Sequence, residues 1–208
     1  MKKEPKLQDD LPREELEKIV LSFTDPRQVR NVRYDGEGNS FPLYDETDLR
    51  DAKAILGVDV KFPLVLPDTE LKISNSVLLR EGDRNTGFAF RHGADALWNS
   101  YRAPYDSAVY DMNDELWLYQ SKEPLFDAAK LSYVRTLYAD GVEIKAYADP
   151  DHVYVGPSYL GNGHDKTKIR SQTYYFWKQN GIYYAACFHG LDADQEENVR
   201  RLAAVPAE

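Results

Sequence analysis

The sequence predicts an α+β fold: an antiparallel meander sheet of about seven to nine strands, with two N-terminal helices and one C-terminal helix. Two observations support this prediction. Short apolar and aromatic runs follow one another between residues 71 and 189, and Asp-Gly or Asn-Gly separates two pairs of them, as in β-hairpins. Strands and helices do not alternate along the chain, so a parallel sheet of βαβ units is not expected.

The clearest local pattern surrounds Asn180-Gly181, which lies between two aromatic runs. Asn and Gly tolerate the positive φ angles of a type I′ turn, so we expect Gln179 to pair with Ile182. Side chains alternate along a strand, which gives residues 172–189 two largely apolar faces. A strand with one face in water would alternate with polar residues, so we expect this hairpin to lie inside the sheet, with much of both faces covered.

Two helices are expected near the N-terminus. Residues 11–23 carry an apolar stripe at i, i+3, i+4 and i+7. Residues 47–56 carry another, with Asp45 or Thr47 as the N-cap and Gly57 as the residue after the helix.

A third helix is expected at residues 192–204, packed on one face of the sheet. Asp192 is the expected N-cap and Gln195 its capping-box partner.

The proline-containing residues 58–68 predict an edge or crossing segment, since proline donates no ladder hydrogen bond. Residues 93–104 are irregular in pattern and are expected to form a loop. The other expected strands are residues 29–34, 71–79, 87–91, 108–112, 115–121, 133–139, 142–148 and 152–155.

The 208 residues are expected to form one domain, residues 1–208, because no linker or repeat interrupts the chain. Residues 1–9 are polar and expected to be mobile. Residues 10–40 either belong to the domain or form a separate N-terminal element.

The composition argues against several functions. A net charge of −9 disfavours nucleic acid and anionic membrane as partners. The single cysteine permits no internal disulfide, and no zinc-binding spacing is present. No apolar run reaches the ~18 residues of a membrane span, so we expect membrane attachment only through an anchor absent from this chain.

We expect no catalytic residue, metal or cofactor. Two acidic and histidine-containing segments match no metal-binding motif: Asp149, Asp151 and His152, and His164 with Asp165. Cys187 and His189 lie two residues apart on one strand, about 6–7 Å, too far for a direct hydrogen bond. Cys187 is therefore expected to be a small buried apolar residue.

An aromatic surface is the best candidate for ligand binding. Trp98, Tyr101 and Tyr105 fall in or beside the segment expected to be a loop, and loops often carry binding residues. The alternative is that such rings are cross-strand pairs in the core.

Three segments in order resemble a known family. AKAILGVDVKFPLVLPD joins a helix ending in Leu-Gly to a strand and a proline-flanked apolar run, and ELWLYQS follows as a strand. YYFWKQNGIYYAACFHGLDADQEENVRRLAAV joins a Trp-containing strand, a Gly turn, a Tyr-rich strand and an acidic-to-basic helix. Residues 47–205 thereby resemble an uncharacterised bacterial domain family, often found C-terminal to a single membrane span in anti-sigma-factor-like proteins.

The resemblance implies an extracytoplasmic sensing or interaction module and transfers no catalytic residues. We therefore expect a non-catalytic domain that binds a small molecule, glycan or protein outside the cytoplasm. A cytoplasmic location is the alternative. The alternative function is a hydrolase that acts on a glycan or peptide through loop carboxylates.

Overall fold

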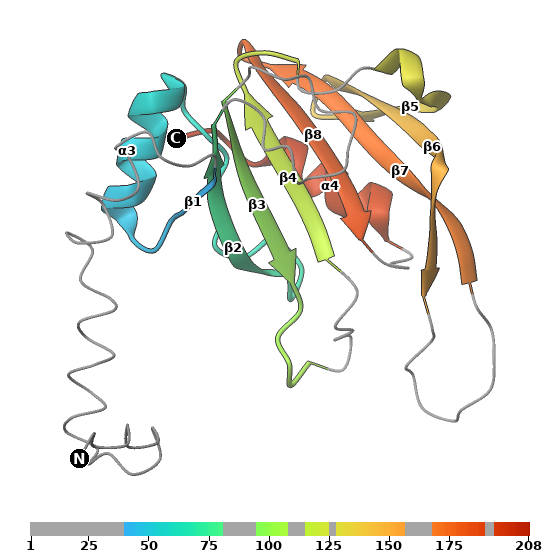
Figure 1. Cartoon of the computed structure of the whole chain (residues 1–208), viewed down its shortest axis with the longest axis horizontal. Helices are drawn as coiled ribbons and strands as arrows, with labels where there is room; N and C mark the ends of the chain where they lie inside the picture. Colours follow the sequence, from blue (N-terminus) through green and yellow to red (C-terminus); the bar gives the residue numbers. More distant parts are fainter. Residues whose placement is uncertain (1–39, 81–94, 108–114, 125–127, 157–167, 190–193) are drawn as a thin grey trace, which may run out of the picture. The chain divides into compact units, whose positions relative to one another are not determined.

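The computed structural model describes residues 40–80, 95–107, 115–124, 128–156, 168–189 and 194–208. By internal contacts the chain divides into two units, Met1–Gly38 and Asn39–Glu208, and the described residues belong to the second. The elements are drawn in Figure 1 and follow in chain order: β1 (Ser40–Pro42), α3 (Glu46–Leu56), β2 (Lys72–Leu79), β3 (Ala96–Arg102), β4 (Glu115–Ser121), the 3₁₀ turn η3 (Ala128–Lys130), β5 (Ser132–Ala139), β6 (Val142–Gly156), β7 (Lys168–Gln179), β8 (Ile182–His189) and α4 (Gln195–Ala204).

The strands form one eight-stranded antiparallel sheet in the order β1-β2-β3-β4-β8-β7-β6-β5. This confirms the α+β class and a strand number within the expected range. The prediction of a single meander is wrong, because β4 pairs with β8 and this pairing joins two four-stranded meanders. The described residues contain two α-helices where the sequence predicts three. The helix expected at residues 11–23 lies outside the described part of the chain.

The hairpin of β7 and β8 has the predicted register. Asn180 and Gly181 have φ angles of 52° and 82°, and Gln179 pairs with Ile182. Both strands lie in the interior of the sheet order, as expected. The Asp-Gly turn between β5 and β6 likewise has positive φ at both residues, 47° and 78°.

One face of the sheet, here called the helix face, packs against α4. In Figure 1, α4 lies behind β8 and β7. The helix contributes Val199, Leu202 and Ala203 to a core cluster that also contains the strand residues Tyr101, Leu116, Leu118, Leu137, Ile144, Ala146, Tyr175, Trp177, Ile182, Tyr184, Ala186 and Phe188. This confirms that the C-terminal helix covers one face of the hairpin.

A buried lysine ties the segment after α3 to the sheet and to α4. Lys61 is 1% exposed. Its backbone N–H donates to Gln120 Oε1 at 2.6 Å, and its carbonyl accepts from Gln120 Nε2 at 2.8 Å. Its ammonium group donates to the carbonyls of Ala203, at 2.7 Å, and Val205 at the end of α4. Apart from an isolated bridge between Val65 and Lys72, residues 58–68 form no strand, so they are not a central strand, as their prolines predict.

The predicted ends of α3 are confirmed, whereas the predicted start of α4 is wrong. Asp45 caps α3 by accepting the Asp48 N–H at 2.8 Å, and Gly57 follows the helix with φ 61°. The capping box of Asp192 and Gln195 is wrong, because Gln195 is the first residue of α4. Asp194 is the N-cap of α4, and its side chain makes no capping hydrogen bond.

Two strand boundaries also differ from the prediction. Residues 96–102 form β3 and not a loop. Their buried polar side chains have hydrogen-bond partners: Asn99 donates to the carbonyl of Lys61, in the segment that crosses the helix face, and the Ser100 hydroxyl shares a hydrogen bond with Ser74 of β2. The expected strands 142–148 and 152–155 are one strand, β6, with an irregularity between Asp149 and Val153. The strands expected at residues 29–34, 87–91 and 108–112 lie outside the described residues.

We predict that Trp177→Ala lowers the free energy of unfolding by about 3–5 kcal/mol. Trp177 is 4% exposed, and its ring stacks on Tyr184 with centroids 5.1 Å apart. Trp177→Phe is the control. The indole N–H of Trp177 has no acceptor within the described residues, so this substitution reduces the buried ring area and removes no hydrogen bond. Denaturant melts measure both variants. A loss below about 1 kcal/mol for Trp177→Ala would show that the ring is not in the core.

A second prediction concerns Lys61. Burial lowers the pKa of Lys61 from 10.5 to about 8. Between these pH values the unfolded chain binds the proton that the folded chain has released, so Lys61 adds stability as pH rises. We expect wild type to gain about 1–2 kcal/mol relative to Lys61→Met between pH 7 and 9.5. Paired denaturant melts at each pH measure this difference, and parallel curves would contradict it.

Candidate ligand-binding cavity

The face of the sheet opposite α4 carries a row of rings and is here called the aromatic face. Register explains the row, because residues paired across neighbouring strands point to the same side. Ring centroids lie 5.7 Å apart for Trp98 and Trp117 and 5.6 Å apart for Tyr147 and Phe176. The described rings of this face run from β3 to β5: Trp98, Trp117, Tyr119, Tyr183, Tyr174, Phe176, Tyr147, Tyr133 and Tyr138.

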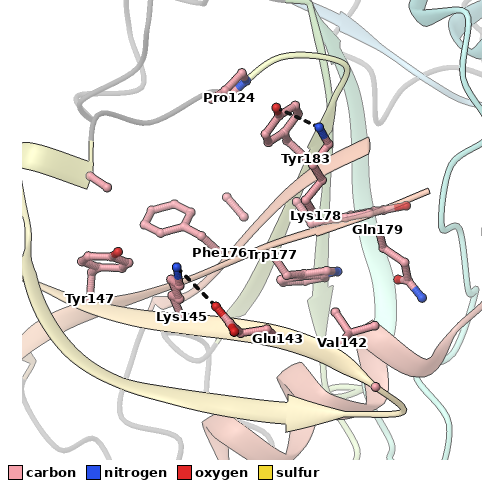
Figure 2. A pocket seen from close by; sticks show the side chains of 14 residues that line it. Pro124, Val142, Glu143, Lys145, Tyr147, Phe176, Trp177, Lys178, Gln179 and Tyr183 are labelled. Carbon is pink, nitrogen blue, oxygen red and sulfur yellow. Dashed lines mark hydrogen bonds and ion pairs between the residues drawn. The ribbon is translucent and has the colours of Figure 1, made fainter. Parts of the chain in front are cut away.

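A cavity of ≈ 620 Å³ opens where β6, β7 and β8 meet the chain between β4 and β5 (Figure 2). This volume suits a small organic molecule, since ligand pockets measure about 300–1,000 Å³. The described residues that line it are Pro124, Ala128, Gly141, Val142, Glu143, Lys145, Tyr147, Phe176, Trp177, Lys178, Gln179, Tyr183, Tyr184 and Ala185.

Phe176 and Tyr147 supply the apolar floor of the cavity. Both rings are half-buried, and Figure 2 shows them side by side with Lys145 next to them. Phe176 pairs across the sheet with Ala185, and Ala185 pairs on its other side with Tyr119. Because alanine is small, it leaves space between two large rings, and this difference in size accounts for part of the hollow.

The rim of the cavity is charged. Lys145 Nζ lies 3.3 Å from Glu143 Oε1, and this hydrogen bond raises the pKa of Lys145. Lys178 Nζ donates to the Tyr183 hydroxyl at 3.1 Å and lies 4.5 Å from the centre of that ring. Figure 2 shows the second pair close to Pro124 and away from the first. The described lining thus holds two cations and one carboxylate.

The predicted ligand residues do not come together. Trp98 is half-buried on the aromatic face, whereas Tyr101 is 0% exposed in the core of the helix face, where burial raises its pKa. Tyr105 follows β3 and is 87% exposed. None of the three is among the residues that line the cavity. The sequence signal that was missed is a pair of lysines on two aromatic strands, Lys145 near the start of β6 and Lys178 near the end of β7.

Cys187 is buried, with 0% exposure, as its aromatic surroundings predict. Burial raises the pKa of its thiol to about 12, so the nucleophilic thiolate is scarce at neutral pH. Within the described ranges, no three or more His, Cys, Asp or Glu side chains are placed to hold a metal ion. His152, His164 and the side chain of His189 lie outside what the structure describes.

Comparison with protein-family models, curated proteins and solved structures finds no match to this chain. The resemblance to the anti-sigma-factor-like family therefore stays a prediction from sequence. Neither α3 nor α4, the helices of the described part, is long and apolar enough to span a bilayer.

We predict that Cys187 resists modification in the folded protein. A thiol-specific chromogenic disulfide should react with it at least about a hundredfold more slowly at pH 8 than after unfolding in guanidinium chloride, because burial removes both access and thiolate. The chain has one cysteine, so the signal has one source. Equal rates in the two states would show that Cys187 is exposed to solvent.

Proposed function

We propose that this protein is a non-catalytic domain that binds a small molecule in the cavity over β6, β7 and β8. The observation that carries the proposal is an aromatic floor beneath a charged rim. Phe176 and Tyr147 offer apolar area to a ligand, while Lys145, Lys178 and Glu143 offer groups that orient it. This combination of apolar walls and few polar groups is typical of ligand sites.

The site is also rigid, which favours binding. All three of its strands are hydrogen-bonded within the sheet, and β7 and β8 have partners on both sides. A site that needs little ordering loses less affinity to conformational entropy. The sequence resemblance supports a sensing role outside the cytoplasm, and this location remains a proposal.

The alternative function is a hydrolase that uses loop carboxylates. Glu143 is the one carboxylate among the described residues that line the cavity, and it is paired with Lys145. Hydrolysis of a glycoside commonly uses two carboxylates on opposite sides of the bond. A hydrolysis assay on the same glycans and peptides, run in parallel with the binding screen, therefore tests this alternative.

Blocking the cavity tests the proposal. Ala128 is exposed and lines the cavity, whereas its exposed neighbour Ala129 does not. We expect a thermal-shift screen of small molecules, glycans and peptides to yield a ligand that stabilises wild type and Ala129→Trp but not Ala128→Trp. A hundredfold excess over Kd corresponds to about 2.7 kcal/mol of stabilisation.

Two outcomes would contradict the proposal. Ligands that stabilise Ala128→Trp as well as Ala129→Trp bind elsewhere. Turnover of a glycan or peptide that is lost on replacing one carboxylate would favour the hydrolase.

A further inference from the structure

We propose that the ligand of this cavity is a small organic anion with a flat apolar body, which lies on Phe176 and Tyr147 and places its anionic group between Lys145 and Lys178. This inference rests on the proposed function and specifies the chemistry of the ligand. Three properties of the two lysines support this inference: their charge, the partners that they contact and their position on the sheet.

The charge of the rim is opposite to that of the whole chain. The protein carries a net charge of −9, yet the described lining of the cavity has two lysines and one carboxylate. A local excess of positive charge beside apolar rings attracts an anion to a protein that otherwise repels it. The second lysine would add no charge attraction for a neutral ligand and would repel a cationic one.

Both lysines have partners that a ligand can replace at little cost. Lys145 and Glu143 have side chains that are 50% and 52% exposed, and exposed ion pairs are weak. Lys178 is exposed and is paired with a neutral phenol, Tyr183. The ring and hydroxyl of Tyr183 carry no negative charge, so they offset the charge of Lys178 only weakly, and a carboxylate or similar group would form a stronger, charge-assisted hydrogen bond.

The register places both lysines around one ring. Lys145 pairs with Phe176 across the β6–β7 ladder, and Lys178 lies two residues beyond Phe176 on the same face of β7. Direct cross-strand neighbours have Cβ atoms about 4.5–5.5 Å apart, and residues i and i+2 about 6–7 Å apart. A flat molecule on the Phe176 ring therefore lies within reach of both flexible ammonium groups.

The same features argue against a glycan or a peptide. Binding of a neutral sugar needs several polar groups directed at its hydroxyls, whereas the lining is mainly aromatic, aliphatic and cationic. Extended peptides commonly add to a sheet edge. β6, β7 and β8, which carry eleven of the fourteen described lining residues, are interior strands.

Three probes of similar shape and different charge test the inference: 2-naphthoate, neutral 2-naphthamide and 2-naphthylmethylammonium. Titration calorimetry and tryptophan fluorescence measure their affinities for the full chain. We expect wild type to bind naphthoate at least about tenfold more tightly than naphthamide, with a preference that falls as salt is added. The ammonium probe should bind most weakly.

Lysine variants locate the anionic group. Lys145→Gln and Lys178→Gln should each reduce the preference for naphthoate, and the double variant should remove it while the affinity for naphthamide stays within about twofold. Lys72→Gln is the matched control, because Lys72 is exposed on β2 and does not line the cavity. It should leave all three affinities unchanged.

The outcomes separate the ligand class from the binding function. Four results would each contradict an anionic ligand. They are equal binding of naphthoate and naphthamide, strongest binding of the ammonium probe, no binding of any probe, and naphthoate binding that the double variant leaves unchanged. None of these results touches the proposed function, which the Ala128→Trp and Ala129→Trp screen decides independently.

Discussion

The pairing of β4 with β8 holds the rest of the structure in place. These strands belong to different meanders and lie about 60 residues apart in the chain, and their ladder joins the two four-stranded meanders into one sheet. Leu116 faces Phe188 and Leu118 faces Ala186 across this ladder, which places the core of the helix face beneath α4. On the other face the same ladder sets Tyr119 beside Ala185, at the edge of the cavity. Without it, each meander would expose an additional unpaired edge.

The two faces of the sheet differ in how they are covered. The helix face is closed by α4 and by the segment around Lys61, whose amide and ammonium groups satisfy polar groups of β4 and of the helix end. On the aromatic face, Tyr119 and Tyr174 are buried while Trp98, Trp117 and Phe176 remain half-buried. A sheet that is rigidly packed on one side can hold partly exposed rings in fixed positions on the other, and this fixed placement suits a preformed site.

The features that could be predicted from sequence are those set by neighbouring residues. Asn180-Gly181 determines its own turn, and the register of β7 and β8 follows from it. The pairing of β4 with β8 could not be predicted in this way, because no local signal selects a partner so distant along the chain. The irregular pattern of residues 93–104 predicts a loop where β3 lies, because the buried partners of the polar residues Asn99 and Ser100 come from segments distant in sequence. The part of the cavity next to Ala185 depends on the pairing of β8 with both β4 and β7, which places this small residue between larger rings.

The outer edge of β5 has a consequence for solubility. β5 ends the sheet order, and Tyr133, Val134 and Tyr138 are 58%, 49% and 65% exposed. Such an edge can template the addition of strands from other molecules. Here the register passes from Tyr133 to Arg135, so Val134 is an extra residue that interrupts the regular spacing of donors and acceptors. This bulge makes the edge a poorer template for pairing with another chain, because the donors and acceptors on either side of Val134 do not follow one regular spacing.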